Sequence, residues 1–165
     1  MVENKEEEFI KWYNEVGITD VGRVGGKNAA LGEMYSNLVP LGVNVPDGFA
    51  ITADAYRFFF KETGLDAEIQ KILADLDTSD IRNLQVRAKK VRQAILKSVL
   101  PQALKDSIGE AYAKLENKYG KNVDVAVRSS ATAEDMPGYS FAGEMETFLN
   151  IKGNKNVLEA VKKCW

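Results

Sequence analysis

The residues most suited to chemistry near the start of the chain form a glycine-rich segment, Gly22-Arg-Val-Gly-Gly-Lys27-Asn. Glycines let backbone N–H groups approach an anion, the N-terminus of a following helix adds about half a positive charge, and Lys27 adds a mobile cation. The segment is not a Walker A loop, because Val21 stands where the first glycine belongs and Asn28 replaces Ser or Thr. It predicts a phosphate site, but a tight strand-to-helix turn with a solvated lysine fits it equally well.

A second candidate segment is centred on Arg128, at the end of an alternating valine stretch over 123–127. Alternation places Arg128 on the face opposite the valines, beside the small Ala126, where a phosphate could reach the guanidinium fork. The residues that follow add hydroxyl and carboxylate groups: Ser129, Ser130, Thr132, Glu134 and Asp135. The alternative interpretation is an exposed arginine at a strand end, followed by a polar turn.

A third segment, 140–148, brings a glycine into a strand at Gly143 and places Thr147 four residues later. A glycine entering a strand indicates close approach by another group, and a threonine hydroxyl can bond a phosphate or ribose. A β-bulge glycine and an ordinary strand threonine are the alternative.

These candidates need elements to position them. Residues 8–16 are aromatic and predict a strand, and the apolar spacing over 27–38 predicts a helix. Thr52 is expected to cap a helix that ends near Gly64. The middle of the chain predicts antiparallel helices over 69–76, 81–99 and 104–115.

Strand alternation returns in the last third, over 123–127 and 145–151, with Met145, Thr147, Leu149 and Ile151 expected on one face. Asn154 is expected to cap a final helix. We therefore expect an α+β domain, with several helices packed on a small, mostly antiparallel sheet.

The composition argues against several classes of protein. The chain of 165 residues is 45% hydrophobic and 28% charged, with a net charge of −2 and no clustering of Lys and Arg, which argues against nucleic acid as the main partner. No apolar run approaches the roughly 20 residues of a membrane span, and one cysteine allows no internal disulfide. We expect a cytoplasmic protein that does not bind membranes. The sequence has no histidine, so chemistry that needs an imidazole requires another chain or domain.

The apolar stripe of the final helix is still running at Trp165. The sequence therefore reads as one domain, 1–165, cut from a longer protein, and an uncovered stripe at 161–165 suggests a homo-oligomer as a hypothesis.

Together, three stretches resemble the phosphoenolpyruvate synthase (pyruvate, water dikinase) family: WYNEVGITDVGRVGGKNAALGEM at 12–34, VNVPDGFAITADAY at 43–56 and VAVRSSATAEDMPGYSFAGEMETFLNI at 125–151. The similarity runs in order through nearly the whole chain. One departure is Gly138-Tyr139, where such synthases tend to have a small residue.

The resemblance implies the N-terminal part of an ATP-grasp nucleotide domain. By motif position, Lys27 would bind ATP phosphates, Arg128 would bind phosphate in ground and transition states and so act in catalysis, and Gly143 and Thr147 would line the phosphate channel. The resemblance also places the Mg²⁺ ligands, the phosphohistidine and the pyruvate site beyond residue 165, so the chain alone would be inactive, with the remaining domains of the enzyme as its partners.

Two other functions stay open at this point. One is a different phosphotransferase of the wider family, such as a pyruvate, phosphate dikinase or a rifampicin phosphotransferase. The other is a stand-alone module that binds nucleotide or a partner without catalysis.

Overall fold

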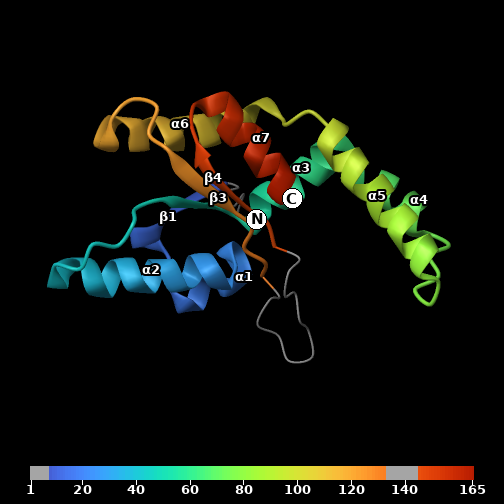
Figure 1. Cartoon of the computed structure of the whole chain (residues 1–165), viewed down its shortest axis with the longest axis horizontal. Helices are drawn as coiled ribbons and strands as arrows, with labels where there is room; N and C mark the ends of the chain where they lie inside the picture. Colours follow the sequence, from blue (N-terminus) through green and yellow to red (C-terminus); the bar gives the residue numbers. More distant parts are fainter. Residues whose placement is uncertain (1–7, 133–144) are drawn as a thin grey trace, which may run out of the picture.

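The structure, a computed structural model, describes residues 8–132 and 145–165. Within these ranges helices dominate, and the strands pair antiparallel in two two-stranded sheets (Figure 1). The strands are β1 (Ile10–Trp12), β2 (Phe49–Ile51), β3 (Val125–Arg128) and β4 (Thr147–Ile151). The α-helices are α1 (Val21–Val24), α2 (Gly26–Leu38), α3 (Ala53–Thr63), α4 (Leu65–Leu73), α5 (Ile81–Lys97), α6 (Gln102–Tyr119) and α7 (Asn154–Cys164).

The α+β class is confirmed, but the single sheet is replaced by separate β1–β2 and β3–β4 pairs. The strand expected over 8–16 shrinks to three residues, because the chain turns directly afterwards in two short 3₁₀ segments, Tyr13–Glu15 and Ile18–Asp20. The Glu15 carboxylate accepts the Trp12 N–H at 2.8 Å and stabilises the first of these turns. Backbone N–H groups taken by such local acceptors cannot extend a strand ladder.

Helix α3 begins and ends as the sequence predicts. Thr52 has extended backbone angles, its hydroxyl accepts the Ala55 N–H at 3.3 Å, and its side chain is 1% exposed. Gly64 follows in the left-handed conformation, and its N–H bonds the Lys61 and Phe60 carbonyls. Together these caps fix both ends of a helix that buries Phe59 and Phe60.

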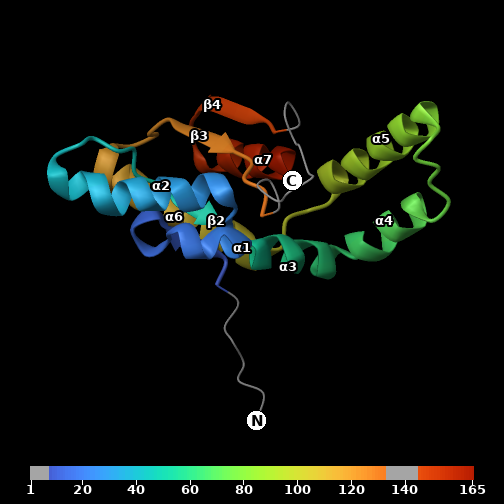
Figure 2. The same ribbon diagram turned by 90° about the horizontal axis from the view of Figure 1, so that it is seen from below.

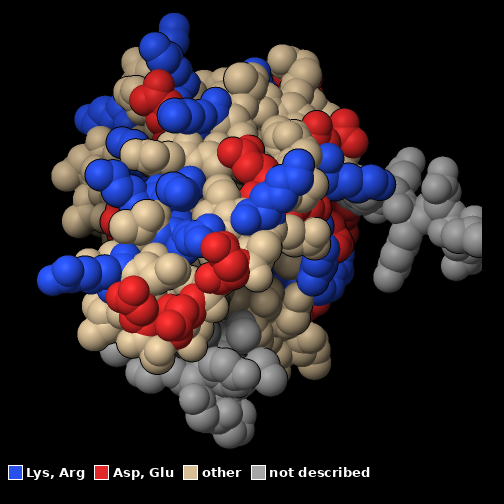
Figure 3. All heavy atoms as spheres, turned by 90° about the vertical axis from the view of Figure 1, so that its right-hand side faces the viewer, with Lys and Arg blue, Asp and Glu red and all other residues tan. Residues whose placement is uncertain are grey.

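Helices α4 and α5 form a hairpin that projects away from the rest of the chain (Figures 1 and 2). Asp80 caps α5, and Arg87 ties the hairpin together by donating to the Ile72 carbonyl at 2.6 Å. The helix expected to reach residue 99 ends at Lys97, because Ser98 is extended and leaves Val99 exposed. On the face of the molecule at this end, Lys and Arg side chains lie between Asp and Glu (Figure 3).

The β3–β4 pair contains an irregularity that overturns one predicted face. Arg128 pairs with Thr147 and Val127 with Phe148, but Val125 pairs with Ile151, so β4 carries one extra residue. Asn150 sits there with φ of +56°. Phe148, paired with the half-buried Val127, is itself half-buried, and Leu149 beyond it is 65% exposed. The bulge then returns Ile151 to the half-buried side, so the face predicted for Thr147, Leu149 and Ile151 is wrong.

Helix α7 is buried along one stripe against α6 and the β3 valines. Its N-cap is Gly153 and Asn154 is the first helical residue, so the cap predicted at Asn154 is wrong. Val157 and Val161 are buried, and the Trp165 ring stacks on Phe59 with centroids 5.1 Å apart. The uncovered stripe expected at 161–165 is thus packed within the chain, and self-association loses that support.

Candidate functional site

The glycine segment and the stretch after β3 lie against each other, although they are far apart in the sequence. Gly25, at φ of +81° and ψ of 159°, is the N-cap of α2, and a Cβ there would overlap the Ser130 side chain and carbonyl. The Asn28 N–H donates to Ser130 Oγ at 3.3 Å, and the Gly26 N–H donates to the Ala131 carbonyl at 3.4 Å. The close approach that glycine allows here is therefore taken by the chain itself.

This packing changes what the α2 N-terminus can do. The N–H groups of Gly26 and Asn28 already have acceptors in the 130–131 stretch. An anion-binding function of the loop would therefore depend on side chains more than on these two backbone donors. Lys27, between them, is half-buried and faces a cavity.

That cavity has a volume of about 700 Å³ and brings the two predicted cations together. Lys27 enters it from the start of α2, and Arg128 enters it from the end of β3. The hydroxyls of Ser129, Ser130 and Thr132 also line it. Two cations and several hydroxyl donors around one cavity of this size suit a polyphosphate anion.

Arg128 is held by the strand pattern that the sequence indicates. The half-buried Val125 and Val127 pack against the cluster formed by α6 and α7, whereas Ala126 and Arg128 are exposed on the other side of β3. The Ser129 N–H, just beyond, donates to the Glu146 carbonyl at 3.3 Å, which fixes the exit from the strand. Arg128 is therefore positioned at a fixed edge, close to the α2 N-terminus.

Tyr13 and Asp47 also line the cavity. Burial raises the pKa of the Tyr13 phenol, while the positive charge of Arg128 opposes that rise. Asp47 is 10% exposed at its side chain and pairs with Lys118 Nζ at 2.6 Å. The aspartate is thereby balanced by a cation from α6.

The remaining predicted site residues are not among the described residues that line the cavity. Thr147 pairs with Arg128 across the β3–β4 ladder and is exposed, but it is not one of the cavity-lining residues among those the structure describes. Gly143, Glu134 and Asp135 lie outside the described residues.

Tyr13, Arg23 and Asp47 are among the cavity residues that the sequence interpretation did not single out. Arg23 stands four residues before Lys27, and that one-turn spacing is the only local pattern that could have indicated it. Nothing local marks Tyr13 or Asp47, because their place in the cavity depends on the packing of β2 and α6.

Cys164 lies at the wall of the cavity and is half-buried. Burial raises the pKa of its thiol to about 11, so at neutral pH it is a packing residue and a poor nucleophile. Within 8–132 and 145–165, no group of three or more His, Cys, Asp and Glu side chains is placed to hold a metal ion. No helix in those ranges is long and apolar enough to span a membrane.

Comparison with known proteins shows the family to which the chain is similar. Residues 21–165 match the family described as "Pyruvate phosphate dikinase, AMP/ATP-binding domain". The chain is 51% identical over 169 residues to a phosphoenolpyruvate synthase of Synechocystis sp., covering 99% of this chain and 21% of that protein. Phosphoenolpyruvate synthases of Aquifex aeolicus and Escherichia coli are each 48% identical, over 163 and 162 residues and 98% of this chain.

The chain spans about a fifth of the length of these relatives: 21%, 19% and 20% in the three cases. The family match, 21–165, reaches from the glycine segment through β3 and β4 to α7, and so includes Lys27 and Arg128. The chain belongs to the pyruvate phosphate dikinase AMP/ATP-binding domain family, and it resembles the N-terminal part of phosphoenolpyruvate synthases.

Proposed function

We propose that this chain binds ATP as the N-terminal part of the nucleotide domain of a phosphoenolpyruvate synthase, which converts ATP, pyruvate and water to AMP, phosphoenolpyruvate and phosphate. The observation that carries this proposal is that Lys27 and Arg128, from separate segments, line one cavity. Both belong to the stretch that matches an AMP/ATP-binding family.

Each residue has a distinct part in this proposal. Lys27 is a point charge at the start of α2 and neutralises phosphate oxygens. Arg128 presents a planar fork that can hold a phosphoryl group through two parallel hydrogen bonds, in the ground state and as charge develops in the transition state. Thr147 pairs with Arg128 across the β3–β4 ladder. By its position in the family's motif, Thr147 is proposed to line the phosphate channel together with the Gly143 backbone.

The rest of the reaction is assigned to other parts of the longer protein. The chain has no histidine and cannot itself carry a phosphohistidine relay. The carboxylates that hold Mg²⁺ and the groups that clamp adenine are proposed to lie beyond residue 165. The expected fold for the whole nucleotide domain is an ATP-grasp, of which this chain is one side.

The test is a calorimetric titration of the chain with Mg·ATP, with Lys27→Ala and Arg128→Ala alongside. Each substitution removes a charge-assisted contact and should raise Kd at least about tenfold. Lys89→Ala is the matched control, because Lys89 is exposed on the projecting α5 and does not line the cavity.

Saturable binding that Lys27→Ala and Arg128→Ala weaken, and Lys89→Ala does not, is the expected result. A folded wild-type chain that shows no heat of binding with Mg·ATP at millimolar concentration would contradict ATP binding by this chain. Equal weakening in all three variants would contradict the cavity as the site.

A further inference from the structure

Arg23 occupies the rim of the same cavity. It lies in α1, one turn before Lys27, and lines the cavity together with Lys27 and Arg128. Its side chain is 45% exposed, so the guanidinium is open to solvent on one side. Arginine offers five N–H donors in a planar fork, a geometry that suits phosphate oxygens.

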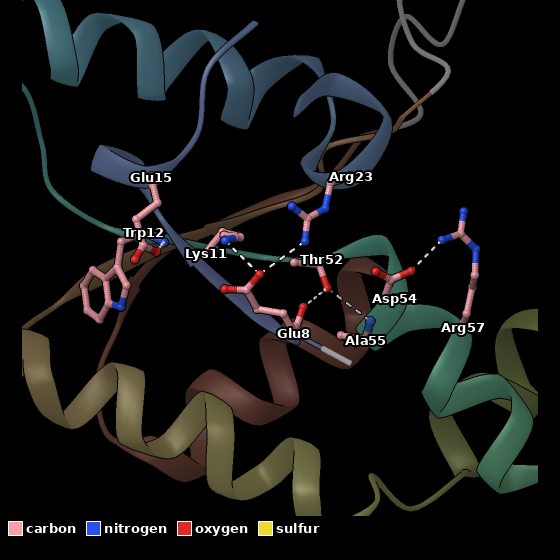
Figure 4. Close-up of polar contacts among 9 residues, drawn as sticks. All are labelled: Glu8, Lys11, Trp12, Glu15, Arg23, Thr52, Asp54, Ala55 and Arg57. Atoms are coloured by element: carbon pink, nitrogen blue, oxygen red, sulfur yellow. Dashed lines mark hydrogen bonds and ion pairs between the residues drawn. The ribbon is translucent and has the colours of Figure 1, made fainter. Parts of the chain in front are cut away.

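The guanidinium of Arg23 is paired with a carboxylate from outside the cavity (Figure 4). Its Nη2 lies 3.2 Å from Glu8 Oε2, and the same oxygen lies 2.7 Å from Lys11 Nζ. The pKa of Glu8 is lowered chiefly by its hydrogen bond to Lys11, and less by that to Arg23. The ion pair of Glu8 with Lys11 is therefore stronger than its ion pair with Arg23.

Glu8 would stay in place if Arg23 moved away. Its carbonyl accepts the Thr52 hydroxyl at 2.8 Å, and Thr52 is buried as the N-cap of α3. Its carboxylate would keep its ion pair with Lys11. Because an exposed ion pair contributes little to stability, and because no carboxylate would be left unpaired, Arg23 can leave Glu8 at low cost.

We propose that Arg23 is a third phosphate-binding cation of this cavity, held by Glu8 in the free chain and transferred to the phosphates of the bound nucleotide. This inference rests on the proposed function, and it adds a residue and an exchange of partners to it. A phosphate oxygen with more than one negative charge nearby competes well for a guanidinium held by a single shared carboxylate oxygen.

Figure 4 also contains a matched control. Arg57 pairs with Asp54 at 2.9 Å, three residues away on the exposed side of α3, and neither residue lines the cavity. Arg57→Gln therefore removes the same charge as Arg23→Gln from the same part of the molecule without touching the site. Asp54→Asn likewise matches Glu8→Gln.

The experiment compares Kd for Mg·ATP and for inorganic tripolyphosphate in the wild-type chain and four variants: Arg23→Gln, Glu8→Gln, Arg57→Gln and Asp54→Asn. Arg23→Gln should raise both Kd values about tenfold. Glu8→Gln should lower them, because it removes the competing carboxylate while leaving its backbone bond to Thr52. The two control variants should stay within about twofold of the wild type, since they lie outside the cavity. Thermal unfolding of each variant verifies that it is folded.

The outcomes distinguish a failure of the inference on Arg23 from a failure of the proposed function. If Lys27→Ala weakens binding but Arg23→Gln stays within twofold of the wild type, the role of Arg23 is overturned and the proposed function stands. If Arg57→Gln weakens binding as much as Arg23→Gln, the effect is one of net charge and the inference is overturned. If Glu8→Gln weakens binding, the exchange of partners is overturned. If the wild-type chain binds neither ligand, the inference and the proposed function fail together.

Discussion

Gly25 shows how a single residue joins the two halves of the candidate site. Its φ of +81° and ψ of 159° fall in a region that other residues rarely adopt, and the space a Cβ would need is filled by Ser130. The sequence indicated a glycine loop built for an anion. The structure gives this glycine a second task, which is to let the loop pack against the segment that follows Arg128.

Substituting Gly25 by Ala should therefore cost stability in two ways. Gly120 is the matched control, since it has φ of +104° and ψ of 153° with open space around it. Gly120→Ala isolates the backbone strain, about 1–3 kcal/mol. Gly25→Ala adds the overlap with Ser130 and should lower the free energy of unfolding by a further 1–3 kcal/mol or so. Urea unfolding of both variants measures the difference. Equal losses would mean that the contact with Ser130 contributes nothing.

At the residue scale, Lys27 and Arg128 could be singled out from the sequence as candidate phosphate ligands. Each combines a charge with a local pattern, which is a glycine loop for Lys27 and strand alternation for Arg128. Arg23 could not, because the sequence does not show that Glu8 holds it at the rim. Asp47 was missed for the same reason, since its partner Lys118 comes from a distant helix. Ion pairs between distant segments produce no periodic pattern in the sequence.

At the scale of elements, α3 was predictable at both ends because Thr52 and Gly64 act through their nearest neighbours. The face of β4 was not, because the bulge beside the left-handed Asn150 depends on the register between β3 and β4. The cap of α7 was misplaced by one residue for a similar reason. Asn154 sits beside Gly109 of α6, so packing decides its role.

Tyr112 is the residue that ties these elements together. Its hydroxyl, on the buried side of α6, donates to the Val123 carbonyl before β3 at 2.7 Å and accepts the Gly153 N–H before α7 at 2.9 Å. The two bonds fix where β3 begins and where α7 begins. Since β3 carries Arg128, this hydroxyl also helps to position the cavity.

Tyr112→Phe should lower the free energy of unfolding by about 1–3 kcal/mol, because the ring stays but two backbone groups lose their partner. Tyr119→Phe is the matched control on the same helix, since Tyr119 is half-exposed and makes one long bond of 3.4 Å to Asp47. It should change stability by less than about 0.5 kcal/mol. Thermal or urea unfolding compares the two, and a neutral Tyr112→Phe would mean that water replaces the lost hydroxyl.

At the scale of the whole molecule, the end of α7 lies near α3, at the root of the projecting hairpin (Figure 1). Trp165 stacks on Phe59 with centroids at 5.1 Å and meets Tyr56 edge-on at 5.8 Å. Because Trp165, Tyr56 and the α7 valines also border the cavity, the contact links the core to the candidate site. An unfinished apolar stripe in the sequence thus becomes an internal contact.

Trp165→Ala should therefore destabilise the chain and loosen the cavity wall. Since Trp165 is only partly buried, the expected loss is about 2–3 kcal/mol, below the cost of removing a fully buried aromatic residue. The variant should also expose Tyr56 and Phe59 and associate at high concentration, whereas the wild type, with this patch covered, should sediment as one species across the same range. Leu149→Ala, at a residue 65% exposed on β4, is the control and should change neither property. Concentration-dependent sedimentation of the wild type with an unchanged Trp165→Ala profile would place the association surface elsewhere on the molecule.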